Sequence, residues 1–172
     1  LNIDGAVIKA VCDIVPEKVQ RIQKWVTDAG FDKPTGYSRG KRDFERMCRE
    51  EELDIVFNAT PWKWHVPICV SAMENDKHAA PEVPAAVDIE GCWKLVETAE
   101  KHGKYCVMLE NCCYDRFEMM MFRMSQMGLL GSLLHAECGY MHDLRNAKFG
   151  KSGKETLWRT EHSTNRDGNI YP

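Results

Sequence analysis

The chain has 172 residues, of which 44% are hydrophobic and 28% are charged, and its formal net charge at pH 7 is −3. This length accommodates one domain and part of a second, and the composition is typical of a globular protein. The small negative charge gives no electrostatic reason to expect nucleic acid or an anionic membrane as a partner. No apolar run approaches the roughly 18 residues that a membrane-spanning helix requires.

The first part of the chain alternates strand-like and helix-like segments. Short apolar runs indicate strands over residues 6–13, 53–59, 77–83 and 104–111. Helices are predicted around them, over residues 16–30, 43–51, 66–76 and 88–103. Such alternation is typical of βαβ units, so we expect an α/β domain with a parallel sheet covered on both faces.

The pattern changes near residue 112. A Met-rich segment predicts a helix over residues 116–128, and a run of mixed polarity predicts a strand over residues 132–144. The tail, residues 145–172, is polar and shows no clear periodicity. We therefore predict two domains, an α/β domain over residues 1–111 and the beginning of an α+β domain over residues 112–172.

Chemistry-bearing residues follow each predicted strand of the first domain, where ligands bind in open α/β sheets. Asp13 ends the first run, the segment ATPWKWHVP (59–67) follows the second, Glu82 follows the third, and Asn111 the fourth. An acidic residue at the end of the second strand of a dinucleotide-binding fold commonly binds the adenosine ribose. If the run over residues 6–13 is that strand, the glycine-rich turn is expected before residue 1, since this chain contains no GxGxxG.

Each of these residues also has a structural alternative. Asp13 could cap the helix that follows it, and Asn111 could serve a turn. Trp62 and Trp64 could pack as core aromatics. Against the last alternative, polar and basic side chains beside two prolines make a buried loop difficult to satisfy. We therefore favour a ligand-binding role for the segment 59–67.

A metal site is a competing interpretation of the second domain. His135 and Glu137 would share one face of the predicted strand, with His142 and Asp143 nearby, and these side chains suit a divalent cation. The chain has no second cluster at ligand spacing, so we predict no metal.

Five segments, taken together, resemble a known family: CDIVPEKVQ, ATPWKWHVP, KHAAPEVPAAV, MLENCCY and HAECGYMHDLR. They are similar to the NAD-dependent oxidoreductase superfamily of glucose–fructose oxidoreductase and inositol dehydrogenase (Gfo/Idh/MocA). Within it, the chain most resembles glycoside hydrolase family 109, the NAD-dependent α-N-acetylgalactosaminidases. The resemblance covers nearly the whole chain and includes the tail LWRTEHSTNRDGNIYP. It implies NAD as cofactor and a Rossmann-type doubly wound parallel sheet whose first strand is missing from this chain.

One tripeptide departs from the wider superfamily. Sugar dehydrogenases there typically carry Glu-Lys-Pro after this strand, and the lysine helps to move the proton of a substrate hydroxyl. Here the tripeptide is Glu82-Val83-Pro84. A valine neither donates nor accepts a proton. The ordinary dehydrogenase mechanism is therefore disfavoured, whereas the hydrolase branch has the same Glu-Val-Pro.

The resemblance also implies roles for individual residues. The implied cofactor contacts are Asp13, Trp62, Lys63, Trp64, His65, Glu82, Val83 and Asn111. The implied sugar contacts are Tyr140, Arg159, Tyr171 and Pro172, and Tyr140 and Tyr171 would take part in catalysis. In the family the last motif continues Tyr-Pro-Thr-His, so we expect a catalytic histidine after Pro172.

The implied reaction is hydrolysis of terminal α-N-acetylgalactosamine without net oxidation. NAD takes a hydride from C3 of the sugar, a base removes the C2 proton, and the glycosidic oxygen leaves C1. Water then adds and the hydride returns, which is an exception to the usual two-carboxylate scheme. Two alternatives stay open: an NAD(P)-dependent sugar oxidoreductase of the same superfamily, and a non-catalytic fragment. We expect a glycan or small sugar as substrate, a homo-oligomer, and either export by a twin-arginine signal or a cytoplasmic location.

Overall fold

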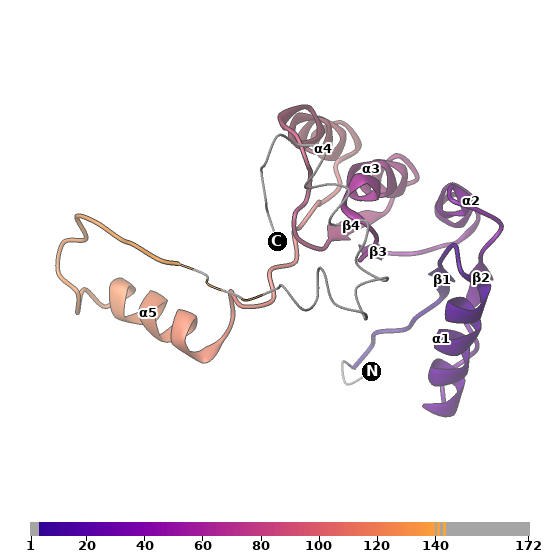
Figure 1. Ribbon diagram of the computed structural model, residues 1–172, viewed down its shortest axis with the longest axis horizontal. Coiled ribbons are helices and arrows are strands. Elements are labelled where there is room, and N and C mark those ends of the chain that lie inside the picture. The colour runs from indigo at the N-terminus through magenta and orange to yellow at the C-terminus, as the bar shows by residue number, and fades with distance from the viewer. Residues whose placement is uncertain (1–3, 140, 142, 144–172) are drawn as a thin grey trace. The chain divides into compact units, whose positions relative to one another are not determined.

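The computed structural model describes residues 4–139, 141 and 143 of the chain (Figure 1). The chain forms two compact units, an N-terminal unit of residues 1–110 and a C-terminal unit that begins at residue 111. No helix among the described residues is long and apolar enough to cross a membrane.

The N-terminal unit contains two pairs of parallel strands. The strands are β1 (Ala10–Cys12), β2 (Thr35–Tyr37), β3 (Ile55–Asn58) and β4 (His78–Pro81). β1 pairs with β2, and β3 pairs with β4. On the free side of β4, Cys106 forms a parallel bridge with Ala79, and Leu109 forms one with Glu82. Parallel strands joined by helices confirm the predicted α/β class.

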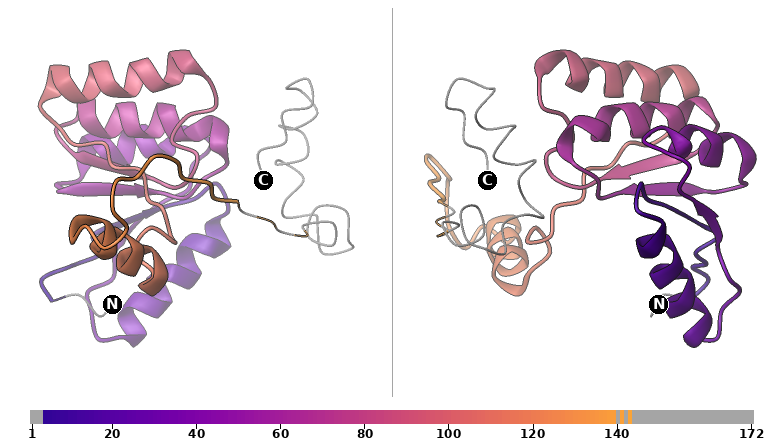
Figure 2. Two further views of the ribbon diagram at one scale, coloured as in Figure 1. Left: turned by 90° about the vertical axis from the view of Figure 1, so that its left-hand side faces the viewer. Right: turned by 45° about the vertical axis from the view of Figure 1, so that its right-hand side comes forward.

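Helices connect these strands and lie on both sides of them. They are α1 (Pro16–Asp28), α2 (Asp43–Glu50), α3 (His65–Glu74) and α4 (Ile89–His102). α1 lies on one side of the strands, and α3 and α4 lie on the other (Figure 2). The clearest helix boundaries are those of α4. Asp88 caps its start by accepting a hydrogen bond from the Gly91 amide at 2.6 Å, and Gly103 ends it at φ 61°.

The core of the N-terminal unit lies between the strands and helices α2, α3 and α4. Its buried members are Tyr37, Phe44, Met47, Cys48, Val56, Ile68, Cys69, Val70, Ala72, Met73, Ala79 and Leu95. β3 shows how the two faces of a strand differ. Val56 and Asn58 are buried against the helices, whereas Phe57 is 68% exposed on the opposite face.

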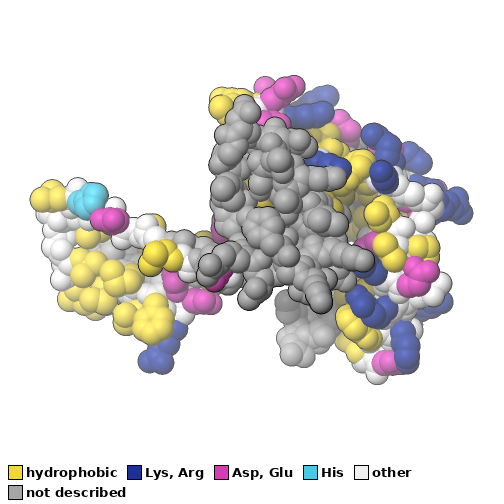
Figure 3. All heavy atoms as spheres, in the orientation of Figure 1, with side chains coloured by type: hydrophobic (Ala, Val, Ile, Leu, Met, Phe, Trp, Pro, Cys, Tyr) yellow, Lys and Arg dark blue, Asp and Glu magenta, His cyan; other side chains and the backbone are white. Residues whose placement is uncertain are grey.

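The C-terminal unit contains one described helix, α5 (Arg116–Gln126), which confirms the predicted Met-rich helix. None of its residues is buried. Figure 3 shows hydrophobic side chains gathered over this segment. Its exposed hydrophobic residues include Phe117, Met121 and Phe122. The predicted strand over residues 132–144 is wrong for its described residues, which form no strand.

Three other elements of the N-terminal unit differ from the prediction. The first strand is shorter, because only Ala10–Cys12 find a partner. The run over residues 104–111 is not a continuous strand but makes two isolated bridges to the β4 side. β2 was not predicted, because the sequence TGY is too short and too polar to indicate a strand without its partner β1.

Candidate functional site

The carboxyl ends of β3 and β4 meet at one edge of the parallel sheet. The amide of Glu82 donates to the carbonyl of Asn58 at 2.8 Å, and the amide of Leu109 donates to the carbonyl of Pro81 at 2.8 Å. The segments that follow these strands therefore leave the sheet side by side. Ligands of open α/β sheets bind at such an edge.

Asp13 follows β1 at the carboxyl end of the other strand pair. Its amide donates to the carbonyl of Tyr37 at 3.1 Å, and its Oδ1 accepts from the amide of Val15 at 2.8 Å. The N-cap of α1 is Val15, with no side-chain cap, so Asp13 is not the helix cap. Its second carboxylate oxygen has no hydrogen-bond partner among the described residues, and it is half-buried. That oxygen suits the hydroxyls of a ribose.

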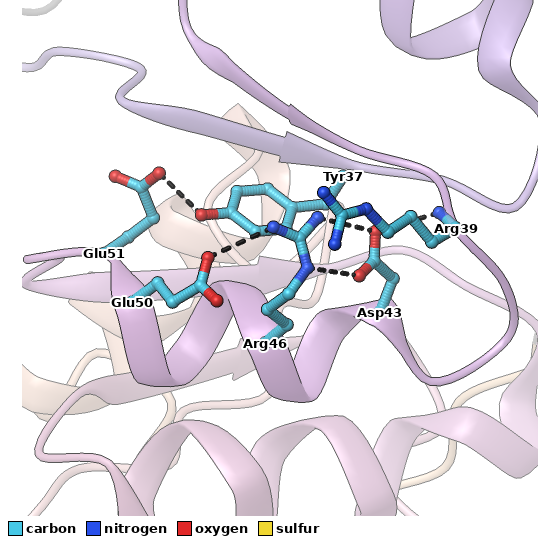
Figure 4. A network of polar contacts seen from close by, with 6 residues as sticks. All are labelled: Tyr37, Arg39, Asp43, Arg46, Glu50 and Glu51. Atoms are coloured by element: carbon cyan, nitrogen blue, oxygen red, sulfur yellow. Dashed lines mark hydrogen bonds and ion pairs between the residues drawn. The ribbon is translucent and has the colours of Figure 1, made fainter.

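A polar network supports the strand pair that carries Asp13 (Figure 4). The guanidinium of Arg46 lies 4.3 Å from the centre of the Tyr37 ring, and its Nε donates to Asp43 Oδ1 at 2.8 Å. The hydroxyl of Tyr37 donates to Glu51 Oε1 at 2.7 Å. α2 is thereby held against the end of β2, and the carbonyl of Tyr37 in turn holds the Asp13 amide.

Hydrogen bonds and burial shift the pKa values of groups in and beside this network. Hydrogen bonds from Arg46 hold the pKa of Asp43 below its usual range, although burial opposes them. Burial, followed by the hydrogen bond to Glu51, raises the pKa of Tyr37. Burial, with the nearby negative charges of Asp43 and Asp13, raises the pKa of the Cys12 thiol to about 12. At neutral pH this cysteine is therefore a protonated, unreactive thiol.

The segment 59–67 follows β3 as a turn, then a 3₁₀ helix, η1 (Trp62–Trp64), then the start of α3. Its tryptophans face the protein more than the solvent. Trp62 is only 4% exposed, and Trp64 packs edge-on against Phe44 with ring centres 6.0 Å apart. Of the four residues from Trp62 to His65, Lys63 alone is exposed. The structural alternative thus explains most of the aromatic surface, and the predicted cofactor contacts of these residues stay predictions.

Asn58, the last residue of β3, organises this turn and was not singled out from the sequence. Its Oδ1 accepts from the amide of Thr60 at 3.2 Å and from the hydroxyl of Thr60 at 2.7 Å. Its Nδ2 donates to the carbonyl of His65 at 3.2 Å. Asn58 is 2% exposed, so these bonds replace the water it gives up. An asparagine inside an apolar strand run was the only sequence signal for this role.

His65 is 1% exposed and contacts two different loops. Its Nε2 lies 2.8 Å from the carbonyl oxygen of Thr60, in the turn after β3. Its Nδ1 lies 2.7 Å from the carbonyl oxygen of Pro84, in the loop after β4. Both ring nitrogens are therefore occupied by backbone groups, which leaves the ring no free nitrogen for a ligand.

The remaining predicted residues divide into two groups. Glu82 and Asn111 are exposed, and Val83 is half-buried. The predicted sugar contacts, Tyr140, Arg159, Tyr171 and Pro172, lie outside the described residues.

The metal alternative is not supported by the described part of the chain. His135 and Glu137 are exposed in an irregular segment rather than on one face of a strand. In that part of the chain, no group of three or more His, Cys, Asp or Glu side chains could hold a metal ion. His142, the third member of the proposed cluster, lies outside it.

Comparison with protein families assigns both units. Residues 2–110 match the oxidoreductase family with an NAD-binding Rossmann fold. The chain belongs to this family. Residues 114–172 match the C-terminal domain of glycosyl hydrolase 109. The two matches confirm the predicted resemblance, including its glycoside hydrolase branch.

Relatives with known names support the same assignment. An α-N-acetylgalactosaminidase of Bacteroides fragilis is 44% identical over 175 residues, which cover 100% of this chain and 41% of the relative. A glycosyl hydrolase family 109 protein of Saccharopolyspora erythraea is 42% identical, over 100% of this chain and 38% of the relative. The chain thus spans about two fifths of the length of the curated relatives it matches.

Solved structures show the same fold at lower identity. The scyllo-inositol dehydrogenase of Lactobacillus casei, solved with bound NAD(H) and scyllo-inositol, superposes with a TM-score of 0.65 at 21% identity. That match covers 76% of this chain and 36% of the dehydrogenase. The WlbA dehydrogenase of Bordetella pertussis, in complex with NADH and UDP-GlcNAcA, gives a TM-score of 0.61 at 17% identity, over 71% and 34%.

The predicted cofactor, NAD, is confirmed by the family match, since the matched domain is an NAD-binding domain. The described residues fit it in part. Asp13 offers an unpaired carboxylate oxygen at the end of β1, and the turn after β3 and the loop after β4 share the edge where a dinucleotide lies.

Proposed function

We propose that the full-length protein is an NAD-dependent glycosidase that releases terminal α-linked N-acetylgalactosamine. The observation that carries the proposal is the adjacency of two domains in one chain. An NAD-binding Rossmann domain over residues 2–110 is followed by the C-terminal domain of glycosyl hydrolase 109. The name of the Bacteroides fragilis relative, 44% identical across the chain, supports the choice of sugar.

Val83 favours the glycosidase over a sugar oxidoreductase. It is the second residue after the end of β4 at Pro81, and it is half-buried. Its side chain has no group that could carry a proton to or from a substrate hydroxyl. An oxidoreductase of this superfamily would need another residue for that step.

The residues of the N-terminal unit would bind and orient the cofactor. Asp13 would accept hydrogen bonds from the adenosine ribose through the oxygen that Val15 leaves free. The turn that begins at Thr60 and the loop that begins at Glu82 would border the nicotinamide end. Bound NAD would supply a transient oxidation of the sugar at C3, which acidifies the proton at C2. Tyr140, Arg159 and Tyr171 would hold the sugar.

The decisive experiment uses the full-length protein and p-nitrophenyl α-N-acetylgalactosaminide in D₂O, with no added NAD. We expect released N-acetylgalactosamine that carries deuterium at C2, because elimination and re-addition exchange that proton with solvent. Cleavage without exchange at C2 would rule out the redox route. Formation of NADH from free sugars, without cleavage, would assign the protein to the oxidoreductases.

Asp13→Asn tests the cofactor site in the same protein. An asparagine keeps an oxygen for the Val15 amide but removes the charge that the ribose hydroxyls would meet. We expect NAD to bind about tenfold or more weakly, which corresponds to the loss of a hydrogen bond to a charged group. Asp54→Asn, at an exposed position just before β3, is the matched control and should leave the affinity unchanged. Equal affinities in the two variants would remove Asp13 from the site.

A further inference from the structure

The loops that follow β3 and β4 are joined through one side chain, that of His65. Its ring lies between the carbonyl oxygen of Thr60, 2.8 Å from Nε2, and the carbonyl oxygen of Pro84, 2.7 Å from Nδ1. Pro84 lies 19 positions farther along the chain than His65 and 24 farther than Thr60. The ring therefore connects two segments that lie beyond the last backbone hydrogen bond between the β3 and β4 strands.

Burial argues that His65 acts on these loops and not on a ligand. Only 1% of the residue is exposed, and both ring nitrogens already face carbonyl oxygens. A neutral imidazole donates to one of these oxygens at a time, and a doubly protonated ring donates to both. In either state the ring offers no nitrogen to a molecule at the sheet edge.

Asn58 fixes the same turn from the strand side. It binds the amide and hydroxyl of Thr60 through Oδ1 and the carbonyl of His65 through Nδ2. The turn after β3 thus has two anchors, Asn58 and His65. In the loop after β4, the amide of Glu82 still donates to the carbonyl of Asn58, and His65 adds a contact two residues farther on, at Pro84. A buried polar network in which every member is paired rigidifies the segments that it joins.

We propose that His65 is a positioning residue that holds the turn 59–62 and the loop 82–87 together and so prepares the sheet edge for NAD without touching it. The proposal rests on the proposed function for its ligand. It replaces the role implied by the family resemblance, in which His65 lines the cofactor itself. Loops that are already rigid lose less conformational entropy when NAD binds, so the contacts of His65 with both loops (the clamp) raise the affinity for NAD.

Two conservative variants of the full-length protein each retain one half of the clamp. In His65→Gln the amide nitrogen takes the place of Nε2 and keeps the bond to Thr60, while the bond to Pro84 is lost. In His65→Asn the amide nitrogen takes the place of Nδ1 and keeps the bond to Pro84, while the bond to Thr60 is lost. The two variants should therefore loosen different loops.

The measurements are amide hydrogen exchange by mass spectrometry and NAD affinity by calorimetry. We expect faster exchange in residues 82–88 for His65→Gln and in residues 59–64 for His65→Asn. NAD should bind about three- to tenfold more weakly to each, and His65→Ala should lose more than tenfold and loosen both segments. His102→Gln, in the last turn of α4, is the control and should change neither exchange nor affinity.

Three outcomes would overturn the proposal. Uniformly faster exchange across the N-terminal unit in both conservative variants would show a general stability role. Lost affinity with unchanged exchange would show that the ring contacts NAD directly. Unchanged exchange and affinity in all three variants would show that the clamp does nothing. If the wild-type protein binds no NAD, the proposed function fails, but the exchange pattern still decides whether His65 holds the loops.

Discussion

Two helices with many apolar side chains, one in each unit of the molecule, differ in how much of their surface is buried. α4 and α5 both carry many apolar side chains, and both helices were predicted, α4 from its helical spacing and α5 as a Met-rich segment. α4 buries Gly91, Leu95 and Thr98 against the rest of the N-terminal unit, whereas α5 has no buried residue. The apolar residues Ile89, Trp93 and Val96 of α4 are nevertheless 77%, 63% and 47% exposed. Apolar spacing thus predicts a helix, but the rest of the fold decides which of its faces is buried.

The helices of the N-terminal unit are covered because most of them connect parallel strands. α1, α2 and α3 each lie between two strands in the chain and pack on strands of this unit, and α4 packs on α3. α3 contacts β3, β4 and α4 at once, and it contributes more fully buried residues than any other described helix. The stability of the described molecule should therefore depend chiefly on α3 and much less on α5.

Met73→Ala should have the largest effect. Met73 lies in α3, is 0% exposed and belongs to the core cluster, so its truncation removes buried apolar contacts and leaves a cavity. We expect the free energy of unfolding to fall by about 2–5 kcal/mol. Urea denaturation followed by tryptophan fluorescence measures this, since four of the five tryptophans, Trp25, Trp62, Trp64 and Trp93, lie in the N-terminal unit. A loss below 1 kcal/mol would contradict the central position of α3.

Asp43→Asn should have the next largest effect on the free energy of unfolding, and this effect should depend on pH. Asp43 is 8% exposed, and removing its charge weakens two hydrogen bonds from Arg46, so we expect a loss of about 2 kcal/mol at pH 7. Its folded pKa lies below the ordinary carboxyl value of about 4. The wild-type carboxylate therefore adds stability above that value, and this contribution disappears as the pH falls through the folded pKa. The free energies of unfolding of the wild-type protein and the variant, measured by denaturation, should converge as the pH falls. A difference that stayed the same at every pH would contradict this account.

Gly36→Ala should have a smaller effect that acts between α1 and β2. A Cβ at Gly36 would lie 2.8 Å from Val19 Cγ1 and 2.9 Å from Gln23 Nε2, both in α1. Gln23 can move, but Val19 is buried and stiff, so α1 has to shift. We expect a loss of about 1 kcal/mol, at the lower end of the range for overpacking. Gly30→Ala is unsuitable as a control because Gly30 has φ 87°, whereas Ala29→Ser, at an exposed position after α1, should be neutral.

Local sequence patterns predict the helices well and the short strands poorly. Pro16, Asp88 and Gly103 mark helix boundaries by their own backbone and side-chain chemistry, which needs no distant partner. β2 has no such local signal and exists because Thr35–Tyr37 pair with β1. The strand predicted over residues 132–144 shows the converse error in its described residues, since a segment forms a strand only where a neighbouring strand pairs with it.

The residues of the candidate site also divide into those that local sequence predicts and those that depend on distant partners. Topology placed Asp13 and Glu82 after strands, because the carboxyl end of a parallel strand can be read from the chain. The sequence could not predict that Trp62 packs inward or that His65 contacts two carbonyl groups, because their partners are a packed interior and backbone groups of other segments. Residue type indicates which groups can form hydrogen bonds, while the fold decides which partners they meet.

Phe122→Ser in α5 should have the smallest effect, and it tests the comparison most directly. Phe122 is 57% exposed, so its truncation removes little buried apolar area. In a chain of these 172 residues, the free energy of unfolding measured by tryptophan fluorescence should change by no more than about 0.5 kcal/mol, as for other surface substitutions. Arg123→Ala, on the same helix and also exposed, is the matched control. A loss that approached the effect of Met73→Ala would mean that other residues cover α5 in solution. α5 would then contribute to stability in the same way as the helices of the N-terminal unit.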